Sequence, residues 1–182
     1  MNRIFTKDEI NSVLGKESFW NPTRLVNTVG YVYGIPAFDT LLDGKLFTEA
    51  GALINIMQRP NGLQIEMARN LKWHSVPLLT SNITEISLED KEQIKVQKEK
   101  SVIGRSIVGG LLLGPVGAVV GGMSGIGTKE VKGEMPDLMI SIKHNSNGPE
   151  EVIVFSCKYK DRKEVEKFFK AQSAFVKTPA TT

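Results

Sequence analysis

Residues 138–171 read LMISIKHNSNGPEEVIVFSCKYKDRKEVEKFFKA. Two apolar runs, 137–145 and 150–160, flank the turn signal Ser146-Asn147-Gly148-Pro149 and predict two paired strands. Asp161 and Glu164 then form a pattern typical of a capping box, which predicts that a helix begins there. Apolar residues recur at helical spacing along that helix: Val165, Phe168, Phe169 and Phe175. An aromatic helix face needs an apolar surface, so this stretch predicts a sheet with a helix closing one open end.

More strands are predicted upstream. Residues 52–69, ALINIMQRPNGLQIEMAR, are two alternating runs joined by Pro60-Asn61-Gly62, a hairpin signal. Residues 72–79 and 82–90 continue the strand pattern, and Ile83, Ile86 and Leu88 are expected to point inward. The expected fold class is therefore α+β, with a curved, mostly antiparallel sheet or a partly open barrel.

The first fifty residues are expected to form an N-terminal appendage, residues 1–50, with a short helix and further strands. The helix is predicted at 6–15, where Thr6 caps the start, Glu9 follows three residues later and Gly15 ends the helix. The rest of the chain divides into a main domain, residues 51–176, and a tail, residues 177–182.

Residues 104–129, GRSIVGGLLLGPVGAVVGGMSGIGTK, carry no charge between Arg105 and Lys129. A nucleotide-binding loop is disfavoured, because Thr128 and Lys129 stand in the reverse of the order such loops require. A dinucleotide-binding loop would need a third glycine where Glu130 stands. A single membrane-crossing helix is disfavoured because Gly114-Pro115 favours a turn, and because crossing would separate strands of one sheet.

We expect residues 101–128 to form an inserted helical hairpin that reverses at Gly114-Pro115. Small residues recur at four-residue spacing, which lets helices approach closely. Three uses remain open: packing on its own domain, self-association or partner contact, and shallow membrane contact. The candidate contact residues are Gly110, Leu111, Leu112, Leu113, Gly114, Pro115, Gly117, Ala118, Gly121 and Gly122.

Basic residues flank the apolar stretch on both sides and are candidates for anionic headgroup contact: Lys98, Lys100, Arg105, Lys129 and Lys132. No aromatic residue occurs between Trp73 and Phe155. Shallow membrane anchors usually carry Trp or Phe, so self-association is favoured over membrane contact.

Two features resemble known protein families. Residues 62–90 and 138–171, with their S-V-P-L step and I-T-E-I strand, resemble bacterial pleckstrin-homology-like (GRAM-like) domains. The glycine stretch is similar to one in small uncharacterised bacterial and phage proteins, and its matching positions are Ser101, Gly104, Arg105, Gly109, Gly110, Gly114, Pro115, Gly117, Ala118, Gly121 and Gly122. The resemblance implies a barrel-like domain with a glycine-zipper-like insertion.

Composition narrows the function. Among 182 residues, 41% are hydrophobic, 24% are charged and the net charge is +3, so we expect a globular domain that does not bind nucleic acid. Cys157 is the single cysteine, and His74 and His144 are the only histidines, so no metal or cofactor site is expected. We expect a non-enzymatic binding or scaffolding module in the cytoplasm, with its membrane surface as the alternative location. The remote alternative is an enzyme acting through Cys157, should His144 approach it.

Overall fold

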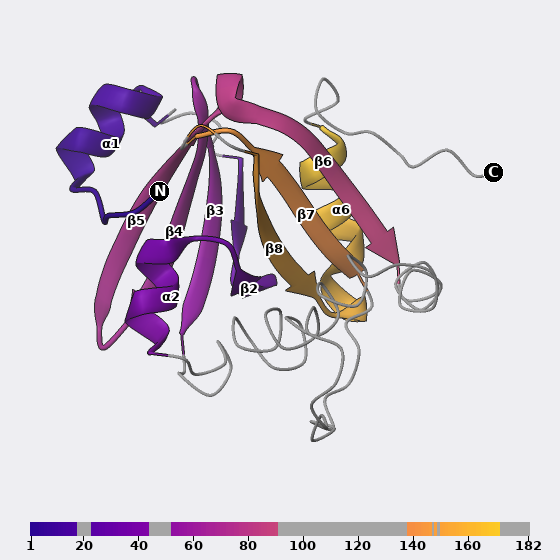
Figure 1. Cartoon of the computed structure of the whole chain (residues 1–182). Coiled ribbons are helices and arrows are strands. Elements are labelled where there is room, and N and C mark those ends of the chain that lie inside the picture. Colours follow the sequence, from indigo (N-terminus) through magenta and orange to yellow (C-terminus); the bar gives the residue numbers. More distant parts are fainter. Residues whose placement is uncertain (18–22, 44–51, 91–137, 147, 149, 172–182) are drawn as a thin grey trace, which may run out of the picture.

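The computed structural model describes residues 1–17, 23–43, 52–90, 138–146, 148 and 150–171 (Figure 1). The elements are α1 (Lys7–Leu14), β1 (Arg24–Val26), β2 (Val29–Tyr33), α2 (Pro36–Leu42), β3 (Leu53–Arg59), β4 (Gly62–Arg69), β5 (Lys72–Leu79), the 3-10 turn η1 (Thr80–Asn82), β6 (Ile83–Asp90), β7 (Leu138–His144), β8 (Glu151–Cys157), the 3-10 turn η2 (Tyr159–Asp161) and α6 (Arg162–Lys170).

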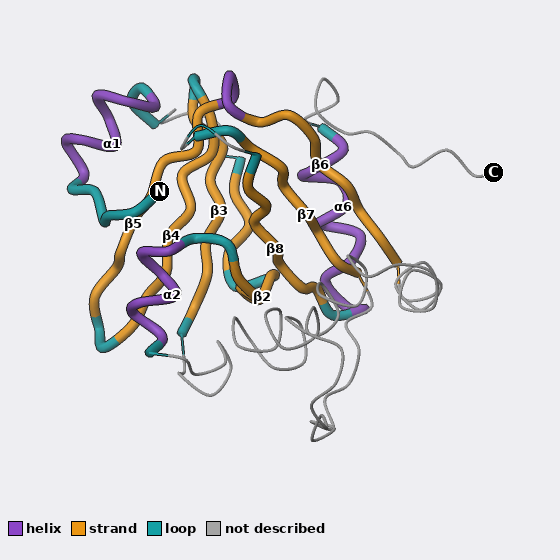
Figure 2. The backbone as a smooth tube through the Cα atoms, in the orientation of Figure 1, coloured by secondary structure: helices purple, strands orange, loops and turns teal. Residues whose placement is uncertain are grey.

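The strands form two four-stranded antiparallel sheets. Sheet A has the order β1-β3-β4-β5 and sheet B the order β2-β8-β7-β6. In Figure 2 the two sheets splay apart around a shared interior. No described ladder joins β5 to β6, so the barrel is not closed. The predicted α+β class with antiparallel sheets and a C-terminal helix is confirmed.

One bent stretch of chain serves both sheets. In β1, Leu25 lies opposite Ile56 of sheet A, and in β2, Val29 lies opposite Cys157 of sheet B. Asn27 lies between them with φ 54° and donates its N–H to the Ile54 carbonyl at 2.9 Å. Asn tolerates this left-handed conformation better than most residues, so the chain bends here while the Asn27 N–H keeps a backbone partner.

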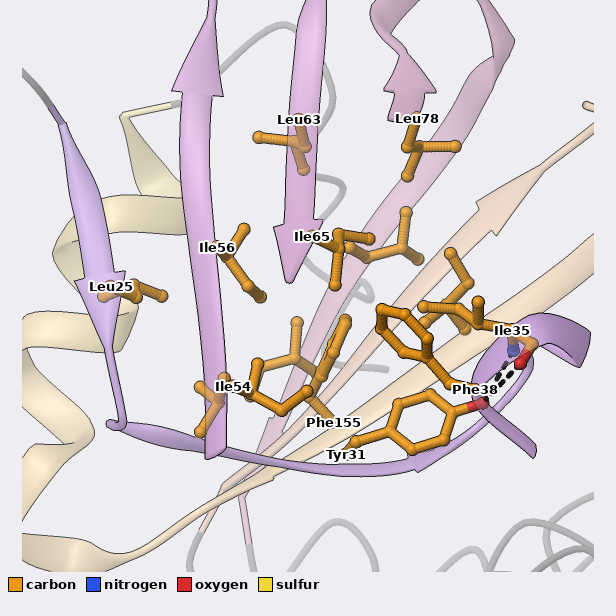
Figure 3. Packing of buried hydrophobic residues seen from close by; sticks show 14 of the residues in the cluster. Leu25, Tyr31, Ile35, Phe38, Ile54, Ile56, Leu63, Ile65, Leu78 and Phe155 are labelled. Atoms are coloured by element: carbon orange, nitrogen blue, oxygen red, sulfur yellow. Dashed lines mark hydrogen bonds between the residues drawn. The ribbon is translucent and has the colours of Figure 1, made fainter. Parts of the chain in front are cut away.

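Tyr31 of β2 links α2 to the buried hydrophobic residues between the sheets (Figure 3). Its ring packs edge-on against Phe38 and Phe155, with centroids 5.7 and 6.2 Å apart. Its hydroxyl accepts the Ile35 N–H at 2.7 Å and donates to Asp39 Oδ1 at 2.6 Å. Burial, together with the charge of Asp39, raises the pKa of Tyr31 far above its ordinary value. Burial also raises the pKa of Asp39.

The C-terminal helix completes the core from another side. Figure 1 shows α6 passing behind β6 and β7. Val165, Phe168 and Phe169 are buried in the same hydrophobic cluster as the inward side chains of both sheets. The aromatic face is thus confirmed for the described residues, whereas Phe175 lies outside them. No side chain caps the start of α6, so the capping box predicted from Asp161 and Glu164 is wrong. The chain enters the helix through η2 instead, which already places Asp161 in a right-handed turn conformation.

Helix α1 covers part of the outer face of sheet A, packing on β4 and β5. The predicted capping box is confirmed: Glu9 N–H is capped by the Thr6 hydroxyl, and Glu9 Oε2 accepts the Thr6 N–H at 2.8 Å. Buried Arg59 at the end of β3 donates from Nη2 to the Gly15 carbonyl at 2.7 Å. The end of α1 is therefore tied to the β3–β4 turn.

The remaining predictions divide in three. The hairpin at Pro60-Asn61-Gly62 is confirmed, and Gly62 is needed there because a Cβ would overlap the Leu78 carbonyl oxygen. The first fifty residues contribute α1, β1, β2 and α2, and the domain boundary expected at residue 50 stays a prediction. The predicted helical hairpin at 101–128 and the tail at 177–182 lie outside the described residues.

His144 is a buried titratable group at the end of β7. Its Nδ1 accepts the Ser146 N–H at 3.4 Å, and its Nε2 has no hydrogen-bond partner among the described residues. Burial lowers the pKa of His144, outweighing the opposite effect of Glu151, which faces it from β8. The positive N-terminus adds to the lowering. The fold therefore favours the neutral imidazole.

Truncation of the aromatic face of α6 tests its role in the core. We expect Phe169→Ala to lower the free energy of unfolding by about 3–5 kcal/mol, because Phe169 is fully buried in the shared core. Lys163→Ala, on the exposed face of the same helix, is the matched control and should change it by less than about 0.5 kcal/mol. Equal melting curves for the two variants in calorimetry would contradict this role.

The buried imidazole predicts a pH dependence. Since the folded pKa of His144 lies below its unfolded value near 6.5, the unfolded state binds the extra proton. The contribution of neutral His144 to the free energy of unfolding is therefore fully present above about pH 6.5. It is lost as the pH falls from about 6.5 toward the folded pKa. We expect His144→Gln to flatten the slope of unfolding free energy between about pH 7 and 5.5, measured by urea titration. An unchanged slope would show that His144 titrates alike in both states.

Candidate functional site

The residues predicted to form the working surface lie outside the described part of the chain. These are the apolar contact residues between 110 and 122 and the basic flanks between 98 and 132. What the structure does place is the pair of strand ends that bracket them: Asp90, the last residue of β6, lies opposite Leu138, the first residue of β7. The chain therefore leaves and rejoins sheet B at adjacent positions.

We call this end of the molecule the insertion end. In sheet B it carries the cross-strand row of Asp90, Leu138 and Cys157, and in sheet A the row of Leu53, Ala68 and Trp73. The two rows lie at the same end because β1 reaches Val26 in sheet A just before β2 begins at Val29 opposite Cys157. Figure 1 shows the β4–β5 turn and the arrowhead of β6 both at the lower end.

Every large hydrophobic side chain that is exposed among the described residues lies near the insertion end. Leu53, Ala68 and Trp73 share the outer face of sheet A, with Leu53 46% and Trp73 50% exposed. Val26 lies beside them on that face, and Tyr159 stands two residues after the end of β8. Leu71, at the tip of the β4–β5 turn, is the most exposed of the five at 105%. Single exposed hydrophobic residues are ordinary, but their confinement to one end is not.

The conformation at Leu71 is strained. Arg69 pairs with Lys72, so Asn70 and Leu71 form a two-residue hairpin turn. Both have positive φ, 52° and 62°, which defines a type I′ turn. Asn is favoured at the first position, but the second is normally glycine, because a Cβ there meets the backbone. Leu71 therefore combines an unfavourable backbone conformation with a side chain that makes no use of the core.

Basic residues bracket these exposed side chains. Arg69 and Lys72 flank the Asn70-Leu71 tip, and Lys158 and Lys160 flank Tyr159. The acidic residues nearest in the chain are Glu66, three residues before Arg69, and Asp161, directly after Lys160. Glu66 lies farther along the outer face of sheet A, where its Oε1 accepts from Gln64 Nε2 at 2.7 Å and Ser75 Oγ at 3.0 Å. Glu66 is thus engaged away from the tip.

The alternative of a Cys157–His144 pair is not assembled. Both belong to the β7–β8 ladder, but His144 pairs with Glu151 at one end while Cys157 pairs with Leu138 at the other. Cys157 is buried, and its Sγ donates to the Lys158 carbonyl at 3.2 Å. Among the described residues no group of three His, Cys, Asp or Glu side chains is arranged to hold a metal ion. Within the same residues, no helix is both long and apolar enough to span a bilayer.

Sequence reasoning missed the exposed side chains of Leu71, Trp73 and Tyr159. The available signal was the short RNLK stretch, residues 69–72, where Asn70 can begin a two-residue turn between alternating runs. Lacking glycine at position 71, this stretch did not stand out as a hairpin tip. The exposure of Trp73 depends on the strand register, which the pattern alone did not fix.

Relief of the strain at the tip is testable. We expect Leu71→Gly to raise the free energy of unfolding by roughly 0.5–1 kcal/mol, because glycine adopts a positive φ without steric cost and no buried contact is lost. Leu71→Ala keeps the Cβ and serves as the matched control, with a smaller change expected. Chemical denaturation measures both, and a Leu71→Gly variant less stable than the wild type would show that the leucine side chain supports the fold.

Comparison with known proteins adds one positive finding. A family model described as "Glycine zipper containing PH domain" matches residues 54–156, from the second residue of β3 to the penultimate residue of β8. No curated protein and no solved structure matches the chain significantly. The matched region covers more than half of the chain and includes both the antiparallel strands and the glycine-rich stretch between β6 and β7. The chain therefore belongs to the family of glycine-zipper-containing PH domains.

Proposed function

We propose that the protein is a non-enzymatic binding and scaffolding module in which the barrel presents the glycine-rich insertion for self-association or contact with another protein. The observation that carries this proposal is the pairing of Asp90 with Leu138. Because the insertion begins and ends at hydrogen-bonded neighbours, sheet B is continuous without it. The insertion is therefore an addition to a complete fold, which is how binding segments are commonly presented on rigid scaffolds.

The sequence of the insertion supports close helix contact. Gly110, Gly114, Ala118 and Gly122 recur every four residues, and Gly117 and Gly121 begin a second such series. Small residues at this spacing let two backbones approach, and the gain in packing is largest when both partners carry them. A second copy of the same chain supplies that match directly.

Substitution of two small residues tests self-association. We expect the double variant Gly114→Leu and Gly121→Leu to lose the oligomer in sedimentation velocity, because added side chains block backbone contact. The matched control, Val119→Leu and Val120→Leu, adds bulk to the same segment at positions that are already large and should keep the oligomer. A wild-type chain that sediments as a monomer at all concentrations, or a glycine variant that stays oligomeric, would contradict the proposal.

Peripheral binding to an anionic membrane is the second candidate function. It is favoured by the exposed hydrophobic side chains at the insertion end, together with the basic flanks Lys98, Lys100, Arg105, Lys129 and Lys132. Basic residues near an anionic surface each contribute about 1 kcal/mol. In the same glycine double variant, binding to anionic liposomes should stay at least as strong as in the wild type, because leucine is more hydrophobic than glycine. Loss of liposome binding in that variant would argue against this candidate.

The proposed location, ligands and non-enzymatic role are those expected from the sequence. We place the protein in the cytoplasm, at the inner face of the membrane if the second candidate holds, and we expect neither cofactor nor nucleic acid as a ligand. The separation of Cys157 from His144 supports a non-enzymatic role, because a thiol needs a nearby base or cation to be activated.

A further inference from the structure

We propose that the insertion end of the barrel is itself a bilayer contact surface, in which Leu71, Trp73 and Tyr159 enter the interfacial layer of an anionic membrane. The adjacent exposed cations, Lys72, Lys158 and Lys160, face the lipid headgroups. This proposal rests on the second candidate function and extends it from the insertion to described residues of the barrel.

The first step is the choice of side chains. Trp and Tyr are the residues enriched at membrane–water interfaces, because each joins an apolar ring to a polar group. Here Trp73 is 50% and Tyr159 76% exposed, and they come from segments far apart in the sequence. The barrel thus brings two interfacial side chains and one fully exposed leucine to the same end.

The second step is the shape of the surface. Leu71 stands at the tip of a two-residue turn, and Tyr159 stands in a short turn between β8 and α6. A stable protein interface normally requires a continuous complementary area of about 800 Å² on each partner. Separate projecting side chains do not form such an area, but they suit a fluid bilayer, which closes around each of them.

The third step is charge. Exposed cations lie beside each projecting hydrophobic segment: Lys72 follows the Asn70-Leu71 tip, and Lys158 and Lys160 stand on either side of Tyr159. Glu66, the acidic group on the outer face of sheet A, is hydrogen-bonded to Gln64 and Ser75 instead. An anionic headgroup layer complements this arrangement, whereas a neutral or cationic surface does not.

The fourth step is the strain at Leu71. Glycine or asparagine would satisfy the turn at lower cost, and a polar residue would be better solvated. The leucine side chain gains nothing from the fold, since it is fully exposed. Burial in a lipid interface gives this side chain a favourable environment that the isolated protein does not offer.

The test measures partitioning of the full chain onto mixed phosphatidylglycerol–phosphatidylcholine vesicles by sedimentation. We expect Leu71→Gly to weaken partitioning by about fivefold, and the triple variant Leu71→Gly, Trp73→Ser and Tyr159→Ser by about fiftyfold or more. The charge variant Lys72→Gln with Lys160→Gln should weaken it by about tenfold at low salt. The matched control, Lys7→Gln in α1 with Lys16→Gln just after this helix, removes the same charge away from the insertion end and should have little effect.

A second measurement places Trp73 directly. In a Trp20→Phe background Trp73 is the only tryptophan, so its emission should shift to the blue and be quenched by brominated lipid when vesicles are added. Circular dichroism of each variant confirms that the fold is retained. Leu71→Gly is expected to be at least as stable as the wild type, which separates lost binding from lost folding.

The outcomes are distinct. Weakened partitioning of the tip variants, with Trp73 quenched, supports the proposal. If the wild type binds vesicles and the triple variant binds equally well, this inference fails, while membrane binding through the insertion stands. If the wild type does not bind at all, both fail. If the triple variant changes the sedimenting species without vesicles, the insertion end is an interface between copies, and the bilayer assignment is overturned.

Discussion

The bend between β1 and β2 is the constraint on which the rest of the architecture depends. A single stretch of chain pairs with β3 in one sheet and with β8 in the other, and the Asn27 N–H bonded to Ile54 fixes where it crosses. Because the crossing occurs between Val26 and Val29, the ends of the two sheets are brought level there. The Leu53–Trp73 row of one sheet and the Asp90–Leu138 row of the other thus belong to the same end of the molecule. A crossing two residues earlier or later would displace these rows relative to each other.

The outer face of sheet A shows how selectively this fold covers hydrophobic surface. Toward the β3–β4 turn, Ile10 and Leu14 of α1 are buried, and Arg59 holds the end of the helix through its hydrogen bond to the Gly15 carbonyl. Toward the insertion end the same face keeps Leu53 and Trp73 half exposed. A polar residue at either position would have removed this exposed hydrophobic surface. Leu71, at the neighbouring turn, is a second case of exposed hydrophobic surface kept at this end, because fold stability alone favours glycine at that position.

Much of the fold could be predicted because its signals are local. The turn at Pro60-Asn61-Gly62, the capping box of Thr6 with Glu9 and the aromatic spacing of Val165, Phe168 and Phe169 each lie within a short window. The crossing at Asn27 could not be predicted, because its partners lie about thirty and more than a hundred residues away in the chain. The exposed surface at the insertion end was missed for a related reason: whether Trp73 faces the core or the solvent depends on a register that only the assembled sheet defines. The glycine-rich stretch was recognised by composition, and the family comparison agrees with that reading.

The positions of Trp73 and Tyr159 bear on how the insertion could contact a membrane. The absence of aromatic residues between Trp73 and Phe155 favoured self-association over membrane contact, on the assumption that an anchor carries its own aromatic side chains. The structure removes that assumption, since Trp73 and Tyr159 lie at the end from which the insertion departs although neither belongs to it. A surface assembled from the β4–β5 turn, η2 and the strand ends of sheet B needs no aromatic residue within the insertion. Self-association and membrane contact then differ in what the small residues of the insertion would contact. In self-association they would meet another backbone. At a bilayer they would only make room for lipid, and the aromatic contacts would come from the barrel.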